Sequence, residues 1–232
     1  VAIVLTTVLF TSLFTIVMSL NESYQTYTFR QIGGYAHGTF KDVTDKQAEE
    51  IKGHKKVKAA GERIVAGIIA EGAFARVPAE VSYMDENNTK WSYIDLKEGR
   101  EPEGTKEIIL DEAALELLGV KPELGAEVTL TFQVSDKKQN GGVRTDTFTL
   151  VGWWEYDPVM PVHYINVSRA YMEQLERDVT GDGLEPFRRD LNVMLSSSLD
   201  IDGTMEEIEE DLGYQRDDPG ADTYLNYGVN WG

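Results

Sequence analysis

The sequence contains no cysteine in its 232 residues. Disulfide bonds, thiolate metal sites and cysteine nucleophiles are therefore excluded. Basic residues are also scarce, because 22 lysines and arginines stand against 40 acidic residues and give a formal net charge of -18. A surface of this sign repels phosphate backbones, so we expect no nucleic-acid partner. The excess acid could attract cationic peptides or metal ions, or it could serve only to keep the surface hydrated.

Catalytic motifs are missing as well. The three histidines, His37, His54 and His163, fall in separate segments without the H-x-x-x-H spacing of a metal site. No G-x-S-x-G nucleophile elbow occurs. The lack of a G-x-x-x-x-G-K-[ST] loop indicates that this chain does not itself hydrolyse ATP. We therefore expect no enzymatic activity, no catalytic residue, no cofactor and no transition-metal site.

Two acidic, glycine-containing segments leave calcium open. They are residues 200–203 (DIDG) and residues 178–183 (DVTGDG). Neither completes the D-x-[DN]-x-[DN]-G pattern with a final glutamate that a calcium loop of the EF-hand type needs. The same residues are common in helix caps and turns, and we prefer that interpretation.

One long apolar run stands at the N-terminus. Residues 1–20 (VAIVLTTVLFTSLFTIVMSL) carry no charge, glycine or proline. Twenty helical residues span about 30 Å, the thickness of a hydrocarbon core, so the run predicts a transmembrane helix. A signal peptide would show a basic start and a small-residue cleavage site, and a buried core helix is the other alternative. Because the chain opens on Val1 and closes on Gly232 without a stop signal, we expect it to be cut from a longer protein.

The N-terminal helix is expected to continue beyond the membrane as a stalk, since no helix breaker occurs before Gly33 and Gly34. Tyr24 and Tyr27 stand where an interfacial aromatic belt would lie. We therefore divide the chain into a transmembrane helix with its stalk, residues 1–33, and an extracytoplasmic domain, residues 34–232. This division places the protein in the cell membrane, with a single visible span and the acidic domain outside.

The remainder has the composition of a folded protein, with 41% hydrophobic residues. Strands and helices mix without regular alternation, which predicts an α+β fold with largely antiparallel pairing, in one domain or in two subdomains with a seam near residues 83–102.

Thr44 and Gln47 form a capping-box pattern, and Asp111 is a predicted helix N-cap. Helices are predicted at 44–53, 112–119, 169–178 and 204–212, with a loop or short helix at 85–93. Strands are predicted at 35–40, 57–71 with an interruption near Gly61, 76–84, 107–110, 126–135, 145–154, 163–167 and 190–197, with a turn at 140–142.

Five sequence blocks in the middle of the chain follow one another at characteristic spacings. In order they are residues 99–102 (GREP), 107–111 (EIILD), 114–119 (ALELLG), 124–130 (LGAEVTL) and 148–152 (FTLVG). This succession resembles the extracytoplasmic core domain of FtsX/MacB-type ABC-transporter permeases. The residues of these blocks are of the kind that stabilise a fold, because they are glycines at turns, apolar strand residues and an apolar helix face. The resemblance therefore indicates the fold and leaves the cargo open.

The resemblance implies that the chain comprises the first transmembrane helix and the MacB-like periplasmic core domain of a permease subunit. It also implies a permease of the kind found in Gram-positive bacteria. Such permeases usually have four spans, work as dimers of one permease or of two paralogues, and bind a separate cytoplasmic ABC ATPase through segments outside this chain. The implied function is mechanotransmission, in which cytoplasmic ATP hydrolysis drives export or other extracellular events. The alternatives are a singly anchored extracellular sensor or ligand-binding domain of a membrane receptor, and a membrane-anchored hydrolase.

The aromatic segment 153–158 (WWEYDP) is the candidate contact surface. Trp153, Trp154 and Tyr156 are the candidate partner- or substrate-binding residues, because exposed Trp and Tyr are enriched at interfaces. The alternative is that Trp153 or Trp154 closes the core at the end of a strand.

Overall fold

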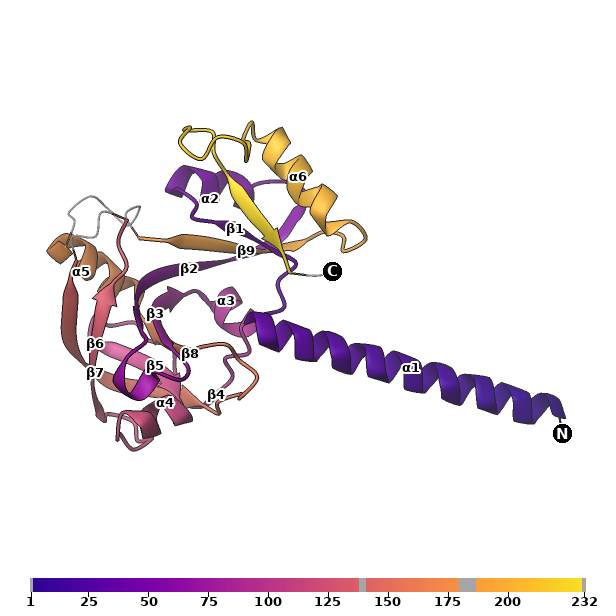
Figure 1. Cartoon of the computed structure of the whole chain (residues 1–232), viewed down its shortest axis with the longest axis horizontal. Coiled ribbons are helices and arrows are strands. Elements are labelled where there is room, and N and C mark those ends of the chain that lie inside the picture. The colour runs from indigo at the N-terminus through magenta and orange to yellow at the C-terminus, as the bar shows by residue number, and fades with distance from the viewer. Residues whose placement is uncertain (1, 138–140, 180–186, 231–232) are drawn as a thin grey trace.

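The computed structural model describes residues 2–137, 141–179 and 187–230. Helix α1 (Ala2–Ile32) extends from the rest of the chain as a rod about 46 Å long at 1.5 Å per residue (Figure 1). Its apolar side chains are largely exposed, including Phe14 at 65% and Met18 at 68%. Thr11 and Thr15 donate their hydroxyl groups to carbonyl oxygens four residues earlier, each at 2.8 Å, so the hydroxyls are satisfied within the helix.

The predicted N-terminal helix with its stalk is therefore present as one continuous helix. Among the residues that the structure describes, however, no helix combines the length and the apolarity that a membrane span requires. The transmembrane character predicted for residues 1–20 is thus not confirmed.

Within the described residues, ten strands form a single mixed sheet with the order β10-β1-β9-β2-β3-β8-β5-β7-β4, and β6 pairs with both β2 and β7. Eight of the ten strand pairings are antiparallel, and β3–β8 and β5–β7 are parallel. The predicted α+β class with largely antiparallel pairing is confirmed. The strands are β1 (Gly38–Lys41), β2 (Val57–Ile69), β3 (Ala79–Met84), β4 (Leu96–Gly99), β5 (Glu107–Asp111), β6 (Glu127–Val134), β7 (Val143–Trp154), β8 (His163–Val167), β9 (Arg189–Leu195) and β10 (Asn226–Val229).

Strand β6 closes part of the sheet into a barrel, because β2, β3, β8, β5, β7 and β6 pair in a continuous ring. Alternate residues of β6 point inward, and Phe132 is 2% exposed in the barrel core. The ring closes at Gly67, where an added Cβ would lie 2.2 Å from the carbonyl oxygen of Gln133. Helices α4 (Glu112–Leu117) and α5 (Arg169–Val179) contribute Leu115 and Tyr171 to the same core.

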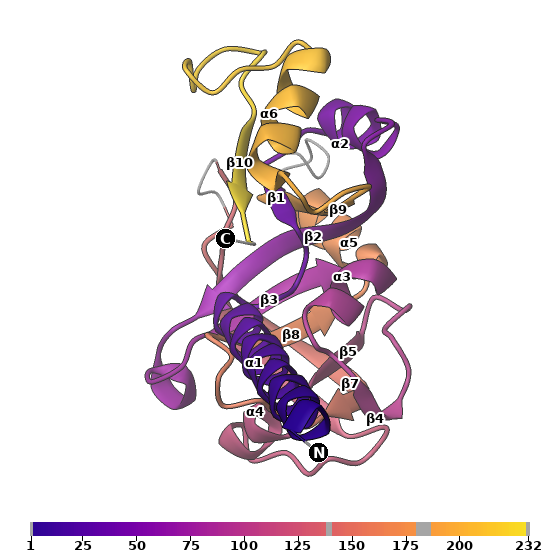
Figure 2. The same ribbon diagram turned by 90° about the vertical axis from the view of Figure 1, so that its right-hand side faces the viewer.

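The other strands form an open extension of the barrel, made of β10, β1, β9 and the first half of β2; we term it the extension sheet. Helices α2 (Asp45–Lys52) and α6 (Ile201–Asp211) lie beside each other against it, in the upper part of both Figure 1 and Figure 2. They bury a second core, separate from that of the barrel, which includes Phe40, Val193 and Met205. Strand β2 runs through both parts and joins them.

The local signals for helix starts are confirmed. The side chain of Thr44 accepts from the backbone N–H of Gln47, and Gln47 reaches back to Thr44, which is the predicted capping box. Asp111 accepts from the N–H of Ala114 at 2.7 Å and caps α4. The polar segment 85–93 contains a short helix, α3 (Glu86–Trp91), and a 3-10 turn lies at Gly72–Phe74.

Three details of the prediction are wrong. Strand β2 is not interrupted at Gly61, since its register shifts lie at Val57/Ala59 and Val65/Gly67. Helix α6 begins before residue 204, because Asp200 accepts from the N–H of Gly203 at 3.0 Å and caps it. Strands β4 and β10 were not predicted. Residues 180–186, Asn140 of the predicted turn and the chain end at 231–232 lie outside the described residues.

Candidate functional site

Helix α1 joins the domain through two glycines. Gly33 adopts a left-handed conformation with φ of 89°, its N–H donates to Arg30, and the N–H of Gly34 donates to Phe29. These two bonds form a Schellman motif, which ends the helix sharply. A Cβ on Gly33 would lie 2.6 Å from the hydroxyl oxygen of Tyr164, so the end of α1 rests directly on the domain surface.

The last turn of α1 is also held by its one basic residue. The Nε atom of Arg30 lies 3.3 Å from Oδ2 of Asp157, and its guanidinium carbon lies 5.6 Å from the ring centre of Tyr93. Tyr93 in turn contacts Tyr35 at a centroid distance of 5.3 Å. The Arg30 side chain is 45% exposed, so solvent screens this ion pair and its contribution to stability is below about 1 kcal/mol.

An open cleft of about 910 Å³ lies beside this contact; we term it the tyrosine cleft. Tyr35, Tyr93 and Tyr156 line it together with several carboxylates. Burial raises the pKa of Tyr93, while the charge of Arg30 opposes that rise. The phenols are therefore neutral near pH 7, and the cleft offers aromatic faces and acids to a ligand.

A smaller, more polar cavity of about 240 Å³ is lined by Gly33 and Gly34; we term it the polar cavity. Its floor is one face of the extension sheet. Side chains alternate between the faces of a strand, so Thr39 and Lys41 of β1 point away from Phe40 and the second core. Cross-strand register places Asp190 and Asn192 of β9 on this same face; with Gly61 and Arg63 of β2 and Gly228 of β10 they form what we term the polar face.

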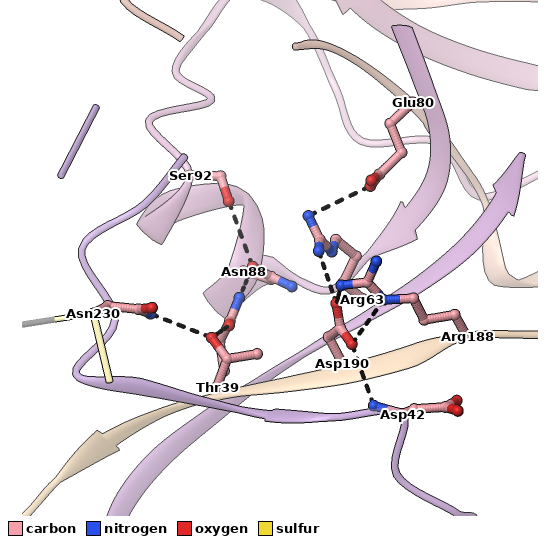
Figure 3. Close-up of polar contacts among 10 residues, drawn as sticks. Thr39, Asp42, Arg63, Glu80, Asn88, Ser92, Arg188, Asp190 and Asn230 are labelled. Atoms are coloured by element: carbon pink, nitrogen blue, oxygen red, sulfur yellow. Dashed lines mark hydrogen bonds and ion pairs between the residues drawn. The ribbon is translucent and has the colours of Figure 1, made fainter. Parts of the chain in front are cut away.

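Two arginines bind one buried carboxylate of the polar face (Figure 3): Arg63 of that face and Arg188, which precedes β9, both contact Asp190. Asp190 is 1% exposed and accepts from Arg63 at 2.8 Å and from Arg188 at 2.7 Å. Burial alone would raise the pKa of Asp190, but hydrogen bonds and charge from Arg188 and Arg63 outweigh it and hold that pKa below its usual value. Burial likewise disfavours the charge on Arg63, yet Glu80 and Asp190 outweigh it and raise the pKa of Arg63. Both groups are therefore ionised near pH 7.

A separate chain of uncharged polar groups lies beside this network and leads to α3, as Figure 3 shows. Thr39 donates to Asn192 at 2.5 Å, and Asn192 donates to Asn88 of α3 at 2.8 Å. Asn230 donates to Thr39 at 3.2 Å from the chain that follows β10. Gly61 permits this approach of α3, because a Cβ there would lie 2.9 Å from the backbone nitrogen of Asn88.

The predicted contact residues take three different positions. Trp153 is 5% exposed in the barrel core, and Trp154 is 6% exposed in a small adjoining cluster with Met84, Ile94 and other residues. Little of either side chain is left for a partner, which favours the alternative that they close the core. Tyr156 is half-buried, lines the tyrosine cleft and stacks on His163 at 4.2 Å, so contact with a partner stays a prediction for Tyr156.

The histidines remain apart in the folded chain. His163 Nδ1 lies 2.9 Å from Oδ2 of Asp111, His37 accepts from the N–H of Leu195, and His54 lies 3.2 Å from Asp211. Over residues 2–137, 141–179 and 187–230, no group of three or more potential ligands gathers in a metal site. Asp200 serves as a helix cap, and residues 180–183 of the other acidic segment are not described.

Sequence reasoning missed the polar face. A signal was present, because Arg63 stands inside the long strand β2 and Asp190 is the second residue of β9, ahead of its apolar residues. Charges in buried strands need partners. The pairing itself joins residues 127 positions apart, so it could not be read locally.

Comparisons with known proteins give structural matches only. No family model and no curated protein matches the sequence. The extracellular domain of the ABC-type transporter YknZ from Gram-positive bacteria is 15% identical over 81% of this chain and 88% of that chain, with a TM-score of 0.47. The periplasmic region of MacB from Actinobacillus actinomycetemcomitans is 11% identical over 85% and 91%, with a TM-score of 0.48. A domain described as part of a permease from Porphyromonas gingivalis is 12% identical over 87% and 89%, with a TM-score of 0.46.

The MacB region bears the name of the family that the five sequence blocks resemble. The first two matches are domains that lie outside the cytoplasm. Since the identities and TM-scores are low, the function proposed below rests on the sequence blocks and on the geometry of this chain.

Proposed function

We propose that the chain is the extracytoplasmic domain of an ABC-transporter permease subunit and that it transmits movement through α1. The five blocks support the permease assignment because they fold against one another. Ile108 of the second block lies beside Leu150 of the fifth in parallel register. Gly99 of the first block faces Gly152, and a Cβ on Gly99 would lie 2.1 Å from the carbonyl oxygen of Val151.

The observation that supports the transmission of movement is the packed entry of α1 into the domain. The helix ends in a hydrogen-bonded cap at Gly33, and Gly33, Ala36 and His37 are buried on the way from α1 to β1. The polar face and α3 meet immediately beneath it. A tilt of α1 would therefore turn the domain with it, which is the property that a mechanical transmitter needs.

We further propose that α1 attaches the domain to the cell membrane, with the domain on the outer side. The exposed apolar side chains of α1, such as Leu13 and Val17, have nothing in the described chain to cover them, so they need an apolar environment elsewhere. Tyr24 and Tyr27 are 72% and 50% exposed and lie where lipid headgroups would be. The partners in this proposal are a cytoplasmic ABC ATPase and a second permease copy or paralogue, and no catalytic residue is assigned to this chain.

Gentle extraction of the complete protein from its native membranes, followed by identification of what co-purifies, tests the proposal. An ATPase subunit in stoichiometric amount, bound to a permease with further spans, is the expected result. A single-span polypeptide without an ATPase would contradict it and would leave a tethered sensor or enzyme.

A further inference from the structure

The polar cavity differs in charge from the rest of the molecule. Lys41, Arg63 and Arg188 line it against the single carboxylate of Asp190, so its lining carries a formal charge of +2, from three cations less one anion. Glu80 does not line the cavity but forms an ion pair with Arg63, and counting its carboxylate reduces the formal charge around the cavity to +1. The whole chain carries -18. A positive cavity in such an acidic protein is not a consequence of composition.

Part of this positive charge is uncompensated. Arg63 and Arg188 both bind Asp190. Lys41 is exposed, and in the described part of the chain no ion pair with its ammonium group occurs. An exposed ammonium group beside two guanidinium groups that share one carboxylate favours an anionic acceptor that arrives from outside.

From this geometry we propose that the polar cavity binds a small oxyanion, either a phosphate or a carboxylate group. Ammonium and guanidinium groups form charge-assisted hydrogen bonds with both chemistries. Thr39, Asn192 and Asn230 line the same cavity and supply hydroxyl and amide groups for neutral parts of a ligand. A volume of about 240 Å³ fits a small soluble molecule and not a polymer.

The polar cavity lies next to the joint between α1 and the domain. Ile32, Gly33 and Gly34 form one wall, so a bound anion would lie against the joint of α1. Anion binding does not depend on the permease assignment, whereas an effect on transmission through α1 rests on the proposed function.

Calorimetric titration of the complete protein in detergent, at low ionic strength, tests the inference with inorganic phosphate and with succinate. We expect saturable binding of at least one of the two, which also shows which oxyanion chemistry the cavity takes. Lys41→Ala and Arg188→Ala should each weaken binding by about tenfold, because each removes a charged hydrogen-bond donor. Lys46→Ala is the matched control, since Lys46 lies on α2 with its side chain 78% exposed and does not line the cavity.

Three outcomes would overturn the inference: no saturable binding of either anion, the same signal from sodium chloride at equal ionic strength, or equal affinity in Lys41→Ala and wild type. Because Lys41 is exposed, its replacement should leave the fold intact, and a far-UV circular dichroism spectrum checks this. Co-purification of an ATPase is unaffected by any of these results, so the inference and the proposed function can fail separately.

Discussion

The two faces of the extension sheet are made by the same strands and are held together in opposite ways. On one face, Phe40, Leu191 and Val193 pack with α2 and α6 into an apolar core. On the other, their immediate neighbours Lys41 and Asp190 belong to the polar face beneath α1. Strand alternation alone produces the difference. The apolar face depends on shape and volume, whereas the polar face depends on charge and therefore on pH.

The largest effect is expected on the apolar face. Phe40 is 0% exposed, and Phe40→Ala should lower the free energy of unfolding by about 4 kcal/mol through lost burial and a residual cavity. Urea denaturation at neutral pH measures it. Leu199→Ala is the control, because Leu199 is 97% exposed and its replacement should change stability little. A loss below about 1 kcal/mol for Phe40→Ala would mean that α2 and α6 do not depend on this face.

A somewhat smaller effect is expected on the polar face, with a pH dependence that the apolar face lacks. Asp190→Asn should cost about 3 kcal/mol at pH 7, because Arg63 loses the charge of a buried partner. The pKa of Asp190 is lowered in the folded state, so its contribution is present above the unfolded value of about 3.9 and is lost as pH falls further.

Urea denaturation of Asp190→Asn and wild type between pH 7 and pH 3 checks this. The difference between the two proteins should shrink on acidification below pH of about 4. A difference that is constant across this range would show that Asp190 acts by its shape and not by its charge. Phe40→Ala, measured in parallel, should show no such convergence.

A third prediction concerns the approach of α3 to the polar face. Gly61→Ala would place a Cβ 2.9 Å from the backbone nitrogen of Asn88 and should destabilise the protein by about 2 kcal/mol. Gly119→Ala is not a suitable control, because Gly119 has φ of 71° and would be strained. Gly53→Ala serves instead, since its φ is -78° and its Cβ would approach no atom closer than 3.4 Å. Equal melting temperatures for both variants would contradict the close contact.

The smallest effect on stability is expected at the α1 joint. Arg30→Ala removes an ion pair with Asp157 and a contact with Tyr93, both half-exposed, and should cost less than about 1 kcal/mol. Arg30→Lys keeps the charge and should fall between Arg30→Ala and wild type. Thermal unfolding of the three proteins measures the order. A loss of several kcal/mol would show that the joint is part of the core and not a surface contact.

Much of the fold could be predicted because its signals are local. The capping box at Thr44, the cap at Asp111 and the alternation in β6 and β7 are patterns of a few residues, and all are present in the structure. Strand β4 (LKEG) was missed because it is short and largely exposed at a sheet edge. Closure of the barrel was missed because β2 meets β6 far along the chain, at Gly67 and Val134.

The site was less predictable than the fold. The sequence drew attention to Trp153 and Trp154, and the structure buries both. Aromatic residues serve cores and interfaces alike, so their identity does not separate the two roles. The charged pair Arg63 and Asp190 was the better signal, but its meaning depends on a β2–β9 register that no local pattern specifies.

The central claim is that α1 and the domain move as one body. Spin labels on Gln25→Cys in α1 and Glu127→Cys at the start of β6 would measure their separation in the complete protein, and this segment has no other cysteine. Insertion of three glycines after Ile32 is the control that should broaden the distances. We predict a single narrow distance distribution that is the same with and without ATP. A broad distribution in the uninterrupted protein, or a shift between the two states, would contradict rigid transmission through α1.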